Sequence, residues 1–172
     1  HQSNTNPKIQ KAIVEYEKLL KNIALNIRLT GSPYGFVSMG STIVCTMRAY
    51  VSIGGMPPKQ ATEDFYFLQQ LAKFDKVHLI KNILVYPSSR AEQRVYLGTG
   101  FRMKNIQNEI HFDDIYIKKK AFESLKVFYD TIEKNWRLES KEILSSLLRN
   151  DSKLLYYLNE KKFMQIINKI QK

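Results

Sequence analysis

Two adjacent carboxylates, Glu63 and Asp64, stand at the start of an apolar helical pattern in the stretch GGMPPKQATEDFYFLQQL, residues 54–71. The Gly- and Pro-rich loop before them places the pair at the first turn of a helix expected over about 62–73. Unpaired backbone N–H groups and the helix dipole favour an ionised acid at this position. Because capping a helix does not need two acids, the pair raises the question whether one of them is a catalytic base.

Helical geometry gives the two acids different directions. At about 100° per residue, Asp64 lies within about 40° of Leu68 and about 20° of Leu71, so it points along the apolar, inward stripe. Glu63 lies about a quarter turn away, toward a more polar face. An inward carboxylate, partly buried but favoured by the helix start, suits a general base for a hydroxyl nucleophile. For an isolated Glu-Asp pair, however, a capping acid beside a solvated Glu is the more common explanation.

The composition is that of a folded globular protein with an excess of positive charge. The chain has 172 residues, of which 44% are hydrophobic and 25% charged, and its formal net charge is +11. A single cysteine, Cys45, excludes an internal disulfide framework and a cysteine-based zinc site. No apolar run approaches the roughly 20 residues of a membrane-spanning helix, and the N-terminus shows no signal-peptide pattern. The positive charge suggests an anionic partner.

The first hundred residues read as a mixture of helices and strands. A long helix is expected from Asn6 and Pro7 to Gly31, with a helical turn at 47–52 and the helix at 62–73 further along. Short β-strands are expected where β-branched and aromatic residues cluster, at 36–38, 41–46, 77–80 and 83–86. A sheet of so few short strands is small for a free-standing α/β domain, which suggests a missing part on the N-terminal side.

The remainder of the chain reads as helical. We therefore expect two parts, residues 1–104 and a helical C-terminal extension at 105–172. Three apolar stripes recur at helical spacing in the extension: Ala121, Leu125, Phe128 and Ile132; Ile143, Leu144, Leu147 and Leu148; Phe163, Ile166, Ile167 and Ile170. The fold class predicted from these patterns is α/β.

The order of several short motifs resembles family 2 glycosyltransferases with the GT-A fold. GSTIVCTMRAYVSIGGM followed by ATEDFYFLQQL is similar to their acceptor-side half, in which a Gly-Ser turn, an Arg-containing helical turn and a Gly-Gly loop precede a Glu-Asp pair. Thr62-Glu63-Asp64 matches the Thr-Glu-Asp of processive members. GSPYGF, Tyr16-Glu17 and YPSSRAEQRVYLGTG resemble a subgroup of bacterial enzymes. The likeness covers about residues 10–104.

The resemblance implies a partial GT-A mixed sheet, in the C-terminal, acceptor-side half of a bacterial enzyme. The implied reaction is the inverting transfer of a sugar from a nucleotide-diphosphate donor to a hydroxyl of a glycan or lipid-linked acceptor. Asp64 would be the general base, and Glu63 would support the site by hydrogen bonding. Such an enzyme would serve polysaccharide biosynthesis for the cell envelope. Its expected location is the cytoplasm, at the inner face of the cell membrane.

Further residues near the pair could bind substrate. Arg90 and Arg94 are four positions apart and would share a face if their stretch is helical, where two guanidinium groups could hold phosphate oxygens. The alternative is that these arginines form salt bridges with Glu92 or face solvent. Thr62 belongs to the implied motif, and glycine turns allow close backbone approach to a ligand, although ordinary turns explain them equally well. The candidates in these turns are Gly40, Ser41, Gly54 and Gly55.

The donor site of a GT-A enzyme needs an Asp-x-Asp metal motif, and none occurs in this sequence. Asp113 and Asp114 follow the catalytic segment instead of preceding it, while His1, His78 and His111 have no ligand spacing. We therefore expect a divalent cation, Mg²⁺ or Mn²⁺, in the complete enzyme and none bound to this chain. The chain itself is expected to be a portion of a longer transferase and inactive alone.

Two other function classes fit the positive charge. A nucleic-acid-binding protein is not expected, because the basic runs at 118–120 and 160–162 are short and diluted by neighbouring acids. A non-catalytic interaction module could instead dock the apolar faces of its tail helices on a protein or a membrane surface. Basic residues beside the last stripe permit contact with anionic lipid: Lys161, Lys162, Lys169 and Lys172.

Overall fold

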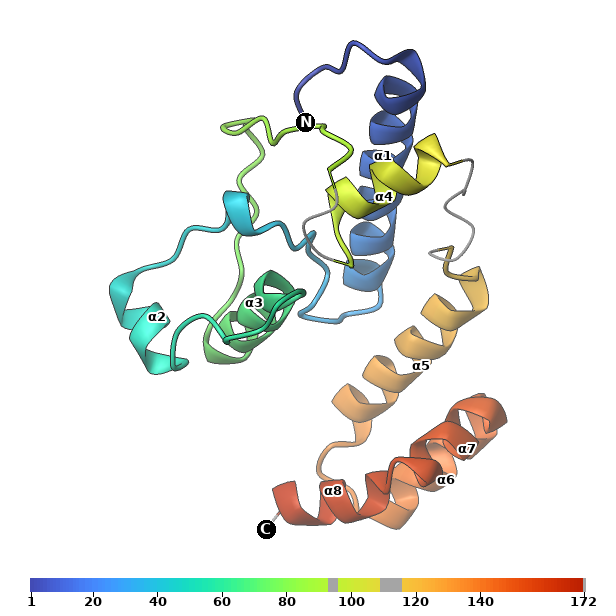
Figure 1. Ribbon diagram of the computed structural model, residues 1–172. Helices are drawn as coiled ribbons and strands as arrows, with labels where there is room; N and C mark the ends of the chain where they lie inside the picture. The colour runs from blue at the N-terminus through green and yellow to red at the C-terminus, as the bar shows by residue number, and fades with distance from the viewer. Residues whose placement is uncertain (93–95, 109–115, 172) are drawn as a thin grey trace. The chain divides into compact units, whose positions relative to one another are not determined.

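The computed structural model describes residues 1–92, 96–108 and 116–171, and the regular elements among them are helices (Figure 1). Their order along the chain is α1 (Pro7–Leu29), the short 3₁₀ helix η1 (Gly40–Thr42), α2 (Met47–Ser52), α3 (Glu63–Phe74), α4 (Thr99–Gln107), α5 (Lys119–Asn135), α6 (Ser140–Asn150), α7 (Ser152–Glu160) and α8 (Phe163–Ile170). The helices expected over 47–52 and about 62–73, and the helical character of the C-terminal part, are confirmed.

The predicted α/β fold class, a partial GT-A mixed sheet, is wrong, since none of the described residues forms a β-strand. The segments expected as strands, 36–38, 41–46, 77–80 and 83–86, have no strand pairing. A strand is stable only when neighbouring strands pair its backbone and other side chains cover its faces. The third and fourth segments lack such cover, because Ile80, Ile83 and Leu84 are 66%, 73% and 68% exposed. The β propensity of these residues is therefore not realised.

The chain divides into two compact units. The first comprises His1–Leu25 and Pro33–Tyr116, and the second comprises Asn26–Ser32 and Ile117–Lys172. The boundary expected between residues 104 and 105 falls inside α4, and the whole of α4 belongs to the first unit. The last turn of α1 belongs to the second unit.

Helix α1 begins where the sequence predicts. The Asn6 side-chain oxygen Oδ1 accepts the backbone N–H groups of Lys8 and Ile9 at 2.9 and 3.4 Å, which satisfies two donors that lack a partner within the helix. Pro7 occupies the first helical position, where its missing N–H costs nothing. One face of α1 then packs with Met103 of α4 in a buried cluster: Ile9, Ala12, Ile13 and Tyr16. This cluster fixes α1 against α4.

A second cluster positions the start of α3. Phe67, Leu68 and Leu71 form the buried face of this helix. They pack against partly buried residues from the segment before α2, from α2 and its C-terminal end, and from the chain after α3: Phe36, Ile43, Cys45, Ala49, Ile53 and Val77. The apolar stripe predicted for α3 is therefore its packing face, and its first turn carries the two acids.

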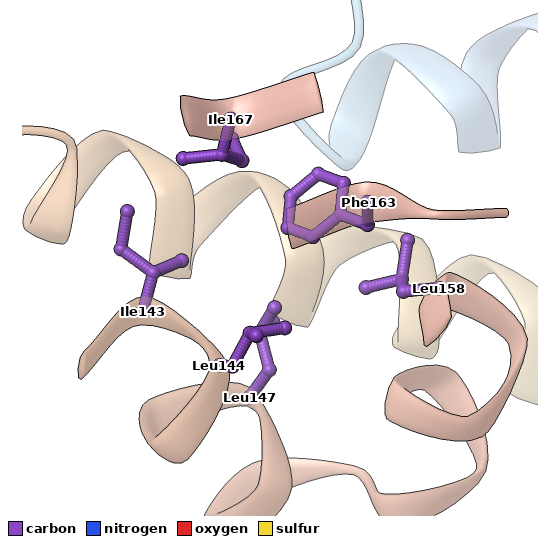
Figure 2. Close-up of a cluster of buried hydrophobic side chains, with 6 residues drawn as sticks. All are labelled: Ile143, Leu144, Leu147, Leu158, Phe163 and Ile167. Carbon is purple, nitrogen blue, oxygen red and sulfur yellow. The ribbon is translucent and has the colours of Figure 1, made fainter. Parts of the chain in front are cut away.

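The second unit has a core of its own, built from α6, α7 and α8 with help from α5 (Figure 2). Its buried side chains are Ile143, Leu144, Leu147, Leu158, Phe163 and Ile167. Three residues of the predicted stripes, Leu148, Ile166 and Ile170, are instead 54%, 47% and 60% exposed, because each helix buries only part of its apolar arc. Among the described residues, no helix has the length and apolar character needed to cross a membrane.

Candidate active site

Asp64 is held by two backbone N–H groups at the first turn of α3. Its oxygen Oδ1 accepts the N–H of Phe65 at 2.7 Å, and Oδ2 accepts the N–H of Gly40 at 3.1 Å. The first bond is local and satisfies a helix-start donor, as the capping explanation requires. The second bond comes from η1, which precedes α3 by more than twenty residues. The side chain is half-buried, so Asp64 is neither solvated freely nor sealed in the core.

The residue before the acidic pair has a strained backbone. Thr62 adopts the left-handed conformation, with φ 65° and ψ 11°, and its side chain makes no capping bond to α3. Its hydroxyl donates instead to the carbonyl oxygen of Ala61. A β-branched residue in this region is uncommon and costs on the order of 1–2 kcal/mol. Strain of this kind is tolerated where the surrounding structure needs one particular chain path, and here that path leads directly into Glu63 and Asp64.

The hydroxyl of Tyr16, on α1, is influenced by charges on α3 and α4. The side chain is 8% exposed, and burial raises the pKa of its hydroxyl above the ordinary value of 10.0. The Arg102 guanidinium acts in the opposite direction and lowers this pKa, while the Asp64 carboxylate raises it. Both charges therefore act on one buried hydroxyl. Helices α1, α4 and α3 each contribute one polar side chain to this group.

Sequence reasoning did not assign a role to Tyr16 or Arg102. Tyr16 follows Ile9 and Ile13 in the apolar stripe of α1, and a hydroxyl group within such a stripe is the signal that could have singled it out. Arg102 lies in α4 immediately before Met103, which is fully buried. A cation next to an apolar core residue is the signal that could have singled out Arg102.

The predicted glycine positions have separate roles. Gly40 binds Asp64 through its N–H, whereas its neighbour Ser41 is exposed. Gly54 and Gly55 have φ values of 79° and 75° and donate to carbonyl oxygens of α2, at Val51 and Tyr50 respectively. These two glycines therefore end α2, as the ordinary turn explanation requires.

The predicted arginine pair is described only in part. Arg90 Nε lies 3.0 Å from Glu92 Oε2, and both side chains are more than half exposed. Arg90 therefore forms the salt bridge to Glu92 that was the alternative to phosphate binding. Arg94 lies outside the described residues, and the shared face stays a prediction. The chain near Glu92 runs close to the start of α4: a Cβ on Gly100 would collide with the Glu92 carbonyl oxygen. Only glycine fits at that contact.

The described residues contain no group of three His, Cys, Asp or Glu side chains that could hold a metal ion. Asp113, Asp114 and His111 lie outside them, and His78 is exposed in an irregular segment. Among the residues that the structure describes, none forms a ligand set for the divalent cation expected for the complete enzyme, so no chemical step is assigned to a metal on this chain.

Comparison of the chain with family models, with curated proteins and with solved structures finds no match. The functional argument therefore depends on the group formed by Asp64, Gly40, Tyr16 and Arg102. A half-buried carboxylate held at a helix start by two backbone N–H groups can accept a proton from a bound alcohol, or can simply cap the helix.

Proposed function

We propose that this chain carries the acceptor side of an inverting glycosyltransferase, with Asp64 as the general base. The observation that supports this most directly is the bond from the Gly40 N–H to Asp64 Oδ2, which holds the carboxylate at a helix start. A capping acid alone needs only the bond to Phe65. Glu63, on the same helical turn, would support the site by hydrogen bonding.

In the proposed reaction, Asp64 takes the proton of an acceptor hydroxyl while the acceptor oxygen forms a bond to the anomeric carbon. The bond from that carbon to the nucleotide diphosphate breaks on the opposite face, and its electron pair leaves with the diphosphate. Each carboxylate oxygen of Asp64 accepts one backbone N–H and has a further lone pair for the incoming proton. The two N–H groups fix its direction before the acceptor arrives, which is the main requirement of a general base.

In this proposal, arginine side chains bind the phosphate groups of the donor. The Arg102 guanidinium acts on the Tyr16 hydroxyl, whose pKa it lowers, and Arg90 and Arg94 would hold phosphate oxygens of the donor. Binding a phosphate requires Arg90 to exchange its exposed pairing with Glu92, which costs little because both side chains are solvated.

The sequence contains no Asp-x-Asp motif, so the donor is expected to bind on a separate domain. The test is to express the complete reading frame that contains these residues and to measure nucleoside diphosphate release from UDP-, GDP- and dTDP-sugars, with oligosaccharide and lipid-linked acceptors. We expect acceptor-dependent release by the complete protein and none by the 172-residue chain. Absence of release with every donor and acceptor pair, from a complete protein that is folded, would contradict the proposal.

A further inference from the structure

The C-terminal end of α8 is fastened to the turn between α5 and α6. Gln171 Nε2 donates to the carbonyl oxygens of Trp136 and Leu138, at 2.8 and 2.9 Å. These bonds lie within the second unit, where the end of α8 and the α5–α6 turn come together (Figure 1). Residues that are distant in sequence therefore share one surface.

Large apolar side chains are exposed on this surface. Trp136 and Leu138 are 39% and 42% exposed, and Ile166 and Ile170 are 47% and 60% exposed. On the helical wheel of α8, Ile166 and Ile170 lie about 60° and 20° from the buried Phe163, on the side away from Ile167. They widen the apolar arc of α8 beyond the part that the core uses (Figure 2 shows the buried part).

Basic residues flank the apolar ones. Arg137 lies between Trp136 and Leu138, and Lys169 precedes Ile170; both cations are exposed. In residues 134–139 and 161–171 taken together there are five Lys or Arg and one acid, Glu139. That acid is engaged in the capping box of α6, where its side chain accepts a backbone N–H. The surface thus combines exposed apolar groups with an excess of positive charge.

We propose that this surface, formed by Trp136, Arg137, Leu138, Ile166, Lys169 and Ile170, docks on a membrane that contains anionic lipid. A lipid surface is the partner that satisfies both features, because the acyl region covers the isoleucines and the headgroups pair with the cations. Tryptophan is favoured at that boundary. A second copy of the chain would bring like charges together, and nucleic acid would leave the isoleucines in water.

The test uses the intrinsic fluorescence of Trp136, since the chain contains one tryptophan. The full chain is mixed with vesicles of phosphatidylcholine alone or of phosphatidylcholine with one quarter phosphatidylglycerol. We expect a blue shift and co-sedimentation with the anionic vesicles, and at least tenfold weaker partitioning to the neutral ones. High salt should weaken the binding. Equal partitioning to both vesicles, or none to either, would overturn the proposal.

Matched variants show whether this surface is responsible. Ile170→Glu and Lys169→Glu should each weaken partitioning about tenfold or more. The controls are Leu148→Glu, at an apolar residue 54% exposed on α6, and Lys153→Glu, at an exposed cation on α7. Leu148→Glu should retain more vesicle binding than Ile170→Glu, and Lys153→Glu more than Lys169→Glu. Circular dichroism confirms that all four variants are folded, with Ile170→Asn as the substitute if Ile170→Glu is not. Equal losses in controls and surface variants would contradict the assignment.

Two further outcomes would show that this surface binds a partner other than lipid. A dimer detected by light scattering without vesicles, and abolished by Ile170→Glu, would show that the surface binds a second copy of the chain. A Trp136 blue shift of equal size with duplex DNA would show a nucleic-acid surface. Neither Asp64 nor sugar transfer enters this experiment, so its result is independent of the proposed function.

Discussion

The backbone nitrogen of Gly40 lies 3.1 Å from the carboxylate oxygen Oδ2 of Asp64. This bond joins η1 to the first turn of α3 and fixes the side chain that the sequence singled out. A helix cap needs only local donors, and Asp64 already has one at Phe65. The bond to Gly40 therefore orients a carboxylate that the chain brings together from two separate segments.

Replacing Asp64 by Asn should reduce transfer by the complete enzyme severely. Asn keeps an acceptor oxygen for one backbone N–H but cannot take a proton, so kcat should fall by about 10²–10⁴ while donor affinity is retained. The measurement is nucleoside diphosphate release at saturating donor. Asp75→Asn, at the other end of α3, is the matched control and should keep full activity. Loss of folding in the Asp64 variant alone would support the capping explanation instead.

Replacing Thr62 by Asn should stabilise the first unit. Asn tolerates the left-handed conformation that Thr62 adopts with φ 65°, so relief of strain should raise the free energy of unfolding by about 0.5–1 kcal/mol. Urea denaturation followed by circular dichroism measures the change. The same substitution at Thr46, an N-cap with φ −73°, should leave stability nearly unchanged because Asn also caps well. A destabilised Thr62→Asn variant would show that the threonine side chain is needed there.

The titration of Tyr16 should report its two charged neighbours. Burial and the Asp64 carboxylate raise the pKa of its hydroxyl, while Arg102 lowers it. Asp64→Asn should therefore lower this pKa, and Arg102→Gln should raise it. The measurement is ¹³C NMR of labelled tyrosine, with Tyr16→Phe to assign the signal. No change of the Tyr16 pKa in either variant would contradict the influence of the two charges on this hydroxyl.

The raised pKa of Tyr16 also predicts a pH dependence of stability. The folded state holds the phenolic proton more tightly than the unfolded state, whose pKa is near 10.0. The contribution of Tyr16 is therefore fully present below about pH 10 and is lost as pH rises through the folded pKa. Tyr16→Phe should show a smaller loss of stability over that range by urea denaturation. An identical alkaline profile for both proteins would contradict this.

Replacing Leu147 by Ala should destabilise the second unit. Leu147 is fully buried in the core of α6, α7 and α8, so its truncation leaves a cavity and should cost about 2–5 kcal/mol. Leu148, the next residue, is 54% exposed, and Leu148→Ala should cost less than about 1 kcal/mol. Thermal unfolding followed by circular dichroism compares the two. Equal losses would mean that the core shown in Figure 2 is not the one that forms.

Replacing Ser124 by Ala should raise the pKa of Asp151. The Ser124 hydroxyl donates to Asp151 Oδ2 at 2.5 Å, and this bond is the main reason why the pKa lies below its ordinary value of 3.8. The stabilisation is present above about pH 4 and is lost as pH falls through the folded pKa. Carboxyl ¹³C NMR gives the titration. Ser145→Ala is the control, because that hydroxyl donates to the Lys141 carbonyl instead.

Much of the helical structure could be predicted because its causes are local. Asn6 and Pro7 mark the start of α1, and the residues Glu63 and Asp64 mark the start of α3, since capping and helix-start electrostatics act within one turn. The strands predicted at 77–80 and 83–86 do not form. A strand is stable only when other strands elsewhere in the fold pair with it, and the local sequence does not show whether such partners exist. The apolar side chains of these segments are exposed instead.

The sequence by itself determined where the helices begin, which acids stand at the start of α3, and the excess of positive charge. Only the tertiary structure decided that Gly40 binds Asp64, that the charges of Arg102 and Asp64 both act on the Tyr16 hydroxyl, and that Ile166 and Ile170 are left uncovered. The reason is the range of the forces involved. Helix capping depends on neighbouring residues, whereas burial and contacts between elements depend on how the whole chain packs.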